Sequence, residues 1–217
     1  MPPKAPKGEY IETDTGNKIS RRSLIHGTQH IILGGKTVIQ SDAVIRGDLY
    51  RSSSTSSHSH SSSHSSSHKP TSSTSSTSGA ASQSQTTPSV AITIGRYSYI
   101  SRQAILRPPS RLHRGVYAFY PLKIGDHVFV GERAVVEAAS VGNHVHIGRD
   151  AVVGSMAILK DFAYVLDGAV VAPGMVVPSW CVVGGAPARI VGEVGEGYGV
   201  EGAEGGMARE RYRVVGR

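Results

Sequence analysis

The sequence of 217 residues has little of the aromatic material from which most globular cores are built. Only 6% of its residues are aromatic, and it contains a single tryptophan. It also contains one cysteine, Cys181, so no disulfide can form within the chain, as is typical of a protein from a reducing compartment. We interpret Cys181 as a packed core thiol rather than a nucleophile, because it falls at a small-residue position of a six-residue repeat.

Long apolar runs are missing as well. No stretch reaches the roughly 18 apolar residues that a membrane-spanning helix needs. Asp167, Pro173 and Pro178 interrupt the most apolar region, and no apolar segment follows the start Met1-Pro2-Pro3-Lys4. The start therefore does not resemble a signal peptide. We expect a soluble, cytoplasmic protein that does not insert into membranes.

Positive charge is in excess but is not concentrated in any one segment. The chain has 23 Lys and Arg against 16 Asp and Glu, a formal net charge of +7. Such an excess can attract nucleic acid or anionic lipid. The basic residues are scattered, however, and no DNA- or RNA-binding motif accompanies them. We therefore predict no nucleic-acid partner.

The second half of the sequence has an aliphatic residue at every sixth position. These residues are Ile124, Val130, Val141, Ile147, Val153, Leu159, Val165, Val171, Val177 and Val183, with one shift of spacing at Val136. A small or slim side chain follows most of them four places later, at Val128, Ala134, Val145, Ala151, Ala157, Ala163, Ala169 and Cys181. This period matches neither an α-helix nor an alternating strand. It is typical of a parallel β-helix, in which three hexapeptides form one triangular coil.

The first half carries the same period less regularly. It runs through Leu33, Ile39 and Ile45, and resumes at Ile94, Ile100 and Leu106. In a narrow prism the aliphatic residue points inward and the small one lies near a corner, which leaves no room for large rings. We predict an all-β fold with a parallel β-helix over residues 30–192. Residues 1–29 would be a lead-in with a strand at Tyr10-Ile11.

Two further segments do not carry the repeat. Residues 51–89 are dominated by Ser and Thr, with histidines at His58, His60, His64 and His68. Such a composition cannot offset the entropy cost of ordering, so we predict a disordered loop. The histidines are irregularly spaced without carboxylates or thiols nearby, so we predict neither metal nor cofactor. Residues 193–217 read as a flexible tail, in which 207–217 form a short basic helix or remain disordered.

A third departure, from Arg107 to Leu122, lies within the predicted β-helix. Its adjacent prolines exclude it from the interior of a sheet. It also holds much of the scarce aromatic content beside arginines, as in a loop that contacts a partner. The alternative is that these aromatics only cover the outside of the prism. The candidate contact residues are Arg107, Arg111, Tyr117, Phe119 and Tyr120.

Hexapeptide solenoids are often acyltransferases, and the segment Val183-Gly184-Gly185-Ala186-Pro187-Ala188-Arg189 resembles the final coil of such enzymes. Those enzymes need a histidine base at a coil edge. The candidates are His127, His144 and His146. His127 and His144 occupy outward rung positions, which favours solvated turn residues over catalytic ones. The Gly-Ala-Pro-Ala-Arg element can also simply turn the chain away from the solenoid.

A second enzyme class with this fold is the γ-class carbonic anhydrase, which Ile45-Arg46-Gly47-Asp48 resembles. Its zinc needs three histidines. Alignment of the rungs places Arg107, Glu132 and Glu137 at the three ligand positions. An arginine cannot bind zinc, and one cation facing two carboxylates indicates a salt bridge. We therefore expect the β-helix fold of these enzymes without their zinc site or their activity.

Several segments resemble the dynactin subunit 5 family. They are Tyr10-Ile11-Glu12-Thr13, Gly16-Asn17-Lys18, Gly35-Lys36-Thr37, Ile45-Arg46-Gly47-Asp48-Leu49, Arg107-Pro108-Pro109 and Ile124-Gly125-Asp126-His127-Val128-Phe129. The similarity takes in most of residues 9–50 and 90–180. Single hexapeptides carry little information, whereas the segments outside the repeat carry more.

The resemblance implies a left-handed, non-enzymatic β-helix in the pointed-end complex of dynactin; the period alone does not fix the hand. It implies dynactin subunit 6, the actin-related pointed-end subunit and the p62-type subunit as partners. It also implies engagement of dynein cargo adaptors, including on endosomes, and a cytoplasmic, cytoskeleton-associated location. The Ser/His-rich insertion and the Gly/Glu-rich tail depart from the family pattern, so contacts made through the tail do not carry over.

Overall fold

The computed structural model describes residues 8–50, 89–113, 115–195 and 206–215. All of the predicted disordered loop except Ser89 lies outside these residues. Residues 196–205 of the predicted flexible tail lie outside them too.

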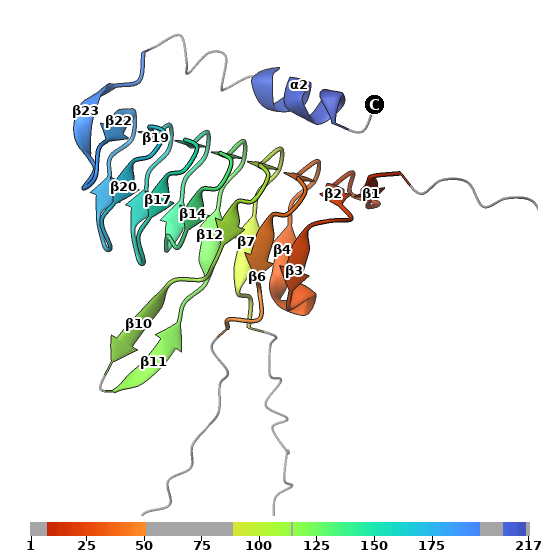
Figure 1. The fold of residues 1–217 in the computed structure, drawn as a ribbon, viewed down its shortest axis with the longest axis horizontal. Helices are drawn as coiled ribbons and strands as arrows, with labels where there is room; N and C mark the ends of the chain where they lie inside the picture. The colour runs from red at the N-terminus through yellow and green to blue at the C-terminus, as the bar shows by residue number, and fades with distance from the viewer. Residues whose placement is uncertain (1–7, 51–88, 114, 196–205, 216–217) are drawn as a thin grey trace, which may run out of the picture.

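Three parallel sheets wrap around one axis to form a triangular prism (Figure 1). Sheet A has nine strands in the order β1 (Tyr10–Glu12), β2 (Lys18–Ser20), β5 (Val38–Ile39), β8 (Tyr99–Ile100), β13 (Phe129–Val130), β16 (His146–Ile147), β19 (Tyr164–Val165), β22 (Cys181–Gly184) and β23 (Arg189–Glu193). The end strands β1 and β23 pair antiparallel with their neighbours. They therefore form the two edges of this sheet and cover the edges of its parallel part.

The other two sheets have six strands each. Sheet B runs β3 (Leu24–His26), β6 (Val44–Arg46), β9 (Ile105–Leu106), β14 (Val135–Val136), β17 (Val152–Val153) and β20 (Val170–Val171). Sheet C runs β4 (Ile31–Leu33), β7 (Ile92–Ile94), β12 (Leu122–Ile124), β15 (Ser140–Val141), β18 (Ile158–Leu159) and β21 (Val176–Val177). The predicted all-β, left-handed parallel β-helix is thus confirmed.

The coil begins earlier than the repeat alone indicates. β2 pairs in parallel with β5, and β3 with β6, so both belong to the prism although they precede residue 30. The expected lead-in strand is β1. A short 3-10 helix, η1 (Thr28–His30), connects β3 to β4.

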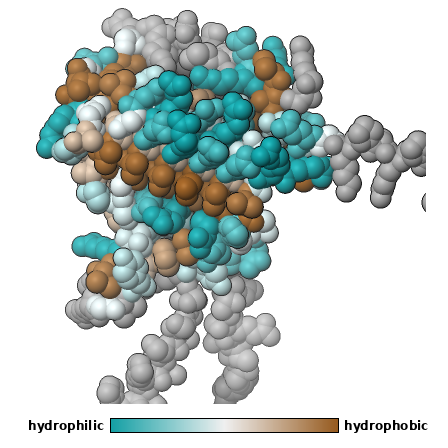
Figure 2. Space-filling model, in the orientation of Figure 1, coloured by the Kyte–Doolittle hydropathy of each residue, from teal (hydrophilic) through white to brown (hydrophobic). Residues whose placement is uncertain are grey.

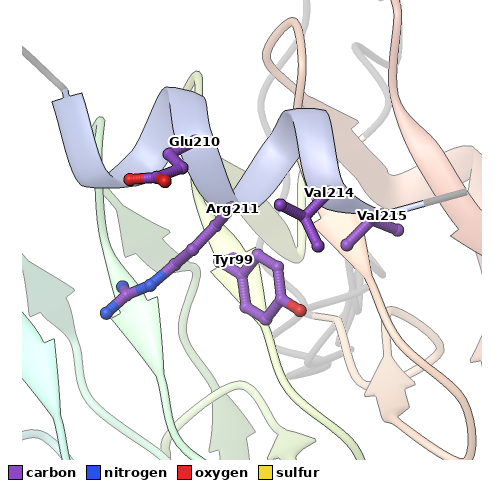
Figure 3. A pocket seen from close by; sticks show the side chains of 5 residues that line it. All are labelled: Tyr99, Glu210, Arg211, Val214 and Val215. Atoms are coloured by element: carbon purple, nitrogen blue, oxygen red, sulfur yellow. The ribbon is translucent and has the colours of Figure 1, made fainter. Parts of the chain in front are cut away.

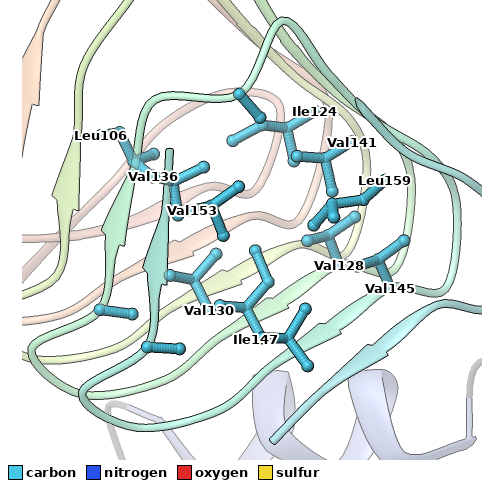
Figure 4. Close-up of a cluster of buried hydrophobic side chains, with 14 of the residues drawn as sticks. Leu106, Ile124, Val128, Val130, Val136, Val141, Val145, Ile147, Val153 and Leu159 are labelled. Carbon is cyan, nitrogen blue, oxygen red and sulfur yellow. The ribbon is translucent and has the colours of Figure 1, made fainter. Parts of the chain in front are cut away.

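The inward positions of the repeat form one continuous core (Figure 4). The aliphatic residues from Ile124 to Val183 are at most 3% exposed, and Val136, at the spacing shift, is fully buried. Ala151 and Ala157 are fully buried as well. Cys181 packs against this core but is only half-buried.

The corner between sheets C and A is tightly built. A Cβ atom on Gly125 would lie 2.6 Å from Asn143 Oδ1, so only glycine fits there. Asx side chains then link successive coils: Asp126 N donates to Asn143 Oδ1 at 2.9 Å, and Asn143 N to Asp161 Oδ1 at 2.6 Å. These bonds satisfy backbone groups that the turn leaves without a sheet partner.

Two elements project from or lie upon the prism. The segment expected as a loop is a β-hairpin of β10 (Ser110–His113) and β11 (Val116–Phe119), paired antiparallel. The prolines lie before it at its root, so the chain pairs with itself outside the three sheets. At the C-terminus, α2 (Gly206–Val214) lies along the prism (Figure 1). Of the two alternatives that the sequence allows for this segment, a short helix or disorder, the structure has the helix.

Candidate interaction surfaces

Two of the candidate catalytic histidines lie in a column of stacked rings at the corner between sheets C and A. His127 and His144 adopt left-handed backbone conformations, with φ of 58° and 56°, and their ring centroids are 4.7 Å apart. Tyr97 and Phe162 extend the column on either side, at 5.3 and 4.8 Å. Both histidines point outward as expected. They lie at turn positions, and the stacked rings leave both half-buried rather than fully solvated.

His146 lies in a second column, on the outer face of sheet A. Its ring is 4.7 Å from that of Phe129 and 4.3 Å from that of Tyr164. Burial, helped by the charge of Arg211, lowers the pKa of His146 to about 4. A general base works best with a pKa near the working pH. His146 is therefore suited to packing rather than to accepting a proton from a substrate.

The positions aligned with zinc ligands hold two separate ion pairs. Arg107 pairs with Glu137, whereas Glu132 pairs with Arg102 at 3.0 Å. The expected arrangement of one cation facing two carboxylates is therefore wrong in detail, since each carboxylate has its own arginine. Within the described parts of the chain, no group of three or more His, Cys, Asp or Glu residues could hold a metal ion.

The hairpin carries most of the candidate contact residues. Tyr117 lies opposite Leu112 in the register, and the two are 66% and 60% exposed. Arg111 is exposed beside them, while Phe119 and Tyr120 are half-buried nearer the prism. Arg107 lies at the root, in its ion pair with Glu137.

The root of the hairpin is fixed to the prism. Ser110 N donates to Ser155 Oγ at 3.2 Å, and the Ser155 hydroxyl donates to Ser110 O at 3.0 Å. Tyr120 N donates to Pro109 O at 2.8 Å. The structure therefore presents the exposed pair at the end of an anchored arm.

The helix α2 closes over the N-terminal part of sheet A. Lys18 Nζ donates to the carbonyl oxygens of Tyr212 and Val215, at 3.0 and 2.6 Å. The Tyr212 hydroxyl donates to Gly16 O at 2.7 Å. The C-terminal end of the described chain is thus fastened to the first coil.

Aromatic and cationic side chains line the space between α2 and sheet A. The Arg211 guanidinium lies 4.1 Å from the centre of the Phe129 ring, and Tyr99 lies beneath the helix (Figure 3). Lys36 Nζ donates to the Tyr97 hydroxyl at 2.9 Å, and this hydrogen bond lowers the pKa of Tyr97. Contacts between aromatic rings and cationic side chains therefore hold α2 against sheet A.

The repeat did not identify this covered face, although the sequence holds a signal for it. Rings recur about one coil apart, in one series from Tyr97 to Trp180 and in another from Tyr99 to Tyr164. From His127 and from Phe129 onward the spacing is 17 or 18 residues, close to three hexapeptides, so each ring lies above the previous one. The first step of each series, from Tyr97 and from Tyr99, is 30 residues long because the hairpin is inserted there. No helix in the described parts of the chain is long and apolar enough to cross a membrane.

The chain is similar to known dynactin proteins in sequence. The family model described as Dynactin subunit 5 matches residues 4–81 and 86–200. The Dynactin subunit 5 of Dictyostelium discoideum is 33% identical over 137 residues, which make up 63% of this chain and 49% of that protein. The chain therefore spans about half the length of that curated relative.

Solved structures share the fold at low sequence identity. A hexapeptide transferase family protein from Anaplasma phagocytophilum superposes with a TM-score of 0.56 at 16% identity, over 92% of each chain. A perosamine N-acetyltransferase from Caulobacter crescentus gives a TM-score of 0.51 at 14% identity, over 82% of this chain and 57% of that one. At these identities the likeness extends to the β-helix alone. Because the family model matches nearly all of the prism, the chain belongs to the dynactin subunit 5 family.

Proposed function

We propose that the chain is a non-catalytic structural and interaction subunit of the dynactin pointed-end complex. Family membership carries the proposal, since the matched residues include nearly the whole prism. The chemistry of the outward residues supports it. The histidines where a hexapeptide acyltransferase would need a base are stacked among rings, and the aligned zinc positions hold Arg107 and two glutamates paired to arginines.

In this role the chain binds other dynactin subunits in the cytoplasm, associated with the cytoskeleton. Its partners are dynactin subunit 6, the actin-related pointed-end subunit and the p62-type subunit, together with dynein cargo adaptors on endosomes and other cargo. No cofactor takes part. The hairpin supplies one contact surface through Arg111 and Tyr117, with Arg107, Phe119 and Tyr120 at its root.

Affinity purification of the endogenous chain tests membership. The actin-related filament subunits should be recovered in fixed proportion to the chain, and a preparation without them contradicts the proposal. The double variant Leu112→Ala, Tyr117→Ala tests the hairpin. We expect recovery of at least one subunit to fall about tenfold, because exposed aromatic anchors often dominate an interface. Ile190→Ala, which is 54% exposed on β23, is the matched control and should leave recovery unchanged.

A trimeric hexapeptide-repeat acyltransferase is the second candidate, favoured by Gly185-Ala186-Pro187-Ala188-Arg189 and by the shared fold. The native mass of the purified chain separates the two. The chain mass is 22.9 kDa, and a dynactin subunit should be recovered at that mass or paired with a different chain. A homotrimer would favour the acyltransferase.

A further inference from the structure

The outer face of sheet B carries an unbroken row of aliphatic side chains, which we name the sheet B stripe. The register places one outward residue of each strand directly beside the next. The six residues are Leu24, Val44, Ile105, Val135, Val152 and Val170. Figure 2 shows an apolar band crossing this face between hydrophilic margins.

The stripe is accessible to solvent along its length. Leu24 is 55% exposed, Val152 and Val170 are each 37% exposed, and the other three are half-buried. None of the described parts of the chain covers it in the way that α2 covers sheet A. A contiguous apolar surface rimmed by polar groups is a mark of an interaction site.

The fold itself does not require aliphatic residues at these outward positions. The equivalent row on sheet C is mixed: in the same parallel register, aliphatic Ile32 on one side and Ile158 and Val176 on the other flank the polar group Thr93, Lys123 and Ser140. Both rows face away from the core on strands of the same prism. The uniformly aliphatic composition of sheet B therefore needs a reason outside folding, and contact with a partner supplies one.

Ion pairs border the stripe on both sides. Arg22–Asp42 and Arg133–Asp150, at 3.2 and 2.6 Å, lie before the strands. On the other side, Arg46 at the end of β6 pairs with Asp48 at 2.7 Å, and Arg107, directly after β9, pairs with Glu137. In each of these pairs the arginine balances the carboxylate, so the pairs add no net charge to the margins. A partner is therefore selected by apolar shape rather than by the sign of its charge.

The width of the stripe indicates what kind of element fits it. Most strands of sheet B have two residues and contribute one outward side chain, so the apolar row is a single side chain wide. A flat sheet, or a second copy packed face to face, would bury the charged margins as well, at a desolvation cost. A cylindrical helix touches the row and leaves the margins in water.

The length of the stripe also matches a helix. Six strands about 4.8 Å apart span about 24 Å between the first and the last. An α-helix of about 16 residues has that length and presents one apolar stripe of its own. On sheet A, α2 already lies across strands of this prism, and Val215, directly after the helix, is only 9% exposed. We propose that the sheet B stripe is the docking site for an amphipathic α-helix of another polypeptide, with aliphatic side chains along one face.

Site-specific photo-crosslinking identifies the occupant. A benzophenone amino acid replaces Val152 in the tagged full-length chain, and Val176, 51% exposed on sheet C, in a control chain. Assemblies are purified after illumination. Crosslinks from position 152 should fall on residues three or four apart within one segment of a different polypeptide, and position 176 should not yield them. Crosslinks to a second copy, to lipid or to a β-strand, or none at all, would overturn the proposal.

A charge substitution provides an independent measurement. Val152→Lys should reduce recovery of the crosslinked polypeptide about tenfold, because a docked helix would bury the ammonium group. Val176→Lys is the matched control, and both variants should keep the wild-type melting temperature because both sites are exposed. If Val152→Lys is unstable, Val152→Thr keeps the branched shape and still adds a polar group. Normal recovery with either folded variant contradicts the proposal.

This inference rests on the proposed function only for the choice of assembly. If the actin-related subunits are absent from the preparation, membership in dynactin fails. The crosslinks from position 152 still report whether a helix occupies the stripe in whatever assembly the tagged chain forms. The two failures are therefore distinguishable.

Discussion

Each hexapeptide has two inward positions, and they hold side chains of different volume. The aliphatic position holds a branched side chain, whereas the position four residues later holds alanine or a similarly slim group. Ala151, Ala157 and Ala163 are all fully buried at such positions. Because the interior is packed at crystal-like density, the corner has no space for a larger group. The small residue is therefore as much a part of the fold as the aliphatic one.

Replacement of Ala157 tests this assignment. Ala157→Leu should destabilise the protein by about 1–3 kcal/mol, because extra methylene groups force neighbouring side chains and backbone to shift. The free energy of unfolding from urea titration measures the loss. Val176→Leu, at an exposed position, is the control and should change it by less than about 0.5 kcal/mol. An unchanged value for Ala157→Leu would mean that this residue does not point inward.

His146 should make stability depend on pH. In the unfolded chain a histidine titrates near pH 6.5, whereas burial, with Arg211 nearby, lowers the folded pKa to about 4. Above pH 6.5 both states are neutral. Between the two values only the unfolded chain binds the proton, so the free energy of unfolding falls as the pH falls. From pH 7 to pH 5 the loss should be about 2 kcal/mol.

Urea titrations at pH 7 and pH 5 measure this loss. His146→Phe keeps a ring between Phe129 and Tyr164 but removes the titrating group, so most of the loss should disappear. A remainder is expected from His127, whose pKa is lowered by burial and by His144. Tyr164→Phe alters the same column and should keep the wild-type loss. An equal loss in His146→Phe and in the wild type would contradict the assignment.

At the scale of elements, His30 holds together the two ends that flank residues 51–88. Its ring stacks on Tyr50 with centroids 3.8 Å apart, and its Nδ1 lies 2.8 Å from Ser89 O. His30 is itself only 8% exposed. The chain therefore leaves the prism and returns to it at nearly the same place. The residues between need not contribute to the closure of the coil.

Deletion of Ser53–Thr87 should leave folding intact. We expect an unchanged or slightly higher free energy of unfolding, because closing a shorter loop costs less entropy. His30→Ala is the informative comparison. It should lower the free energy of unfolding by about 1 kcal/mol, because the hydrogen bond and the stacking contact are lost. Thermal melts followed by circular dichroism measure both. Loss of soluble protein on deletion would show that the segment supports the fold.

The elements that the sequence predicted are those whose signal is local and repeated. The six-residue period predicts that Val130, Ile147 and Val165 point inward, and in the structure all three are fully buried. For the hairpin the sequence predicts only a loop, because Pro108 and Pro109 dominate its start, and the pairing of Leu112 with Tyr117 in the structure shows two strands. Pairing of this kind depends on how two short segments meet, which a hexapeptide period does not encode.

At the scale of the molecule, the two ends of the chain meet. Lys18 bonds to carbonyl oxygens 194 and 197 positions away in the sequence. In a repeat protein each coil contacts only its neighbours, so a terminal coil has support on one side alone. Ile19 and Ile25, in the first coil, are only partly buried. The helix α2 adds contacts to this coil from the outer face of sheet A, through Lys18 and Gly16. A periodic pattern cannot reveal such a contact, because it relates each residue only to the next rung.

Removal of α2 should therefore loosen one end of the prism selectively. In a chain ending at Gly195, amides of β2 should exchange with solvent about tenfold faster, while those of β19 and β22 keep their protection, because local opening free energies follow local contacts. Hydrogen exchange followed by mass spectrometry measures this distribution. Tyr212→Phe removes the hydrogen bonds that the hydroxyl donates to Gly16 O and to Glu12 Oε1 but keeps the helix, so it should give an intermediate change of about fivefold, equivalent to about 1 kcal/mol. A uniform change along the prism, or none at β2, would mean that α2 does not support the first coil.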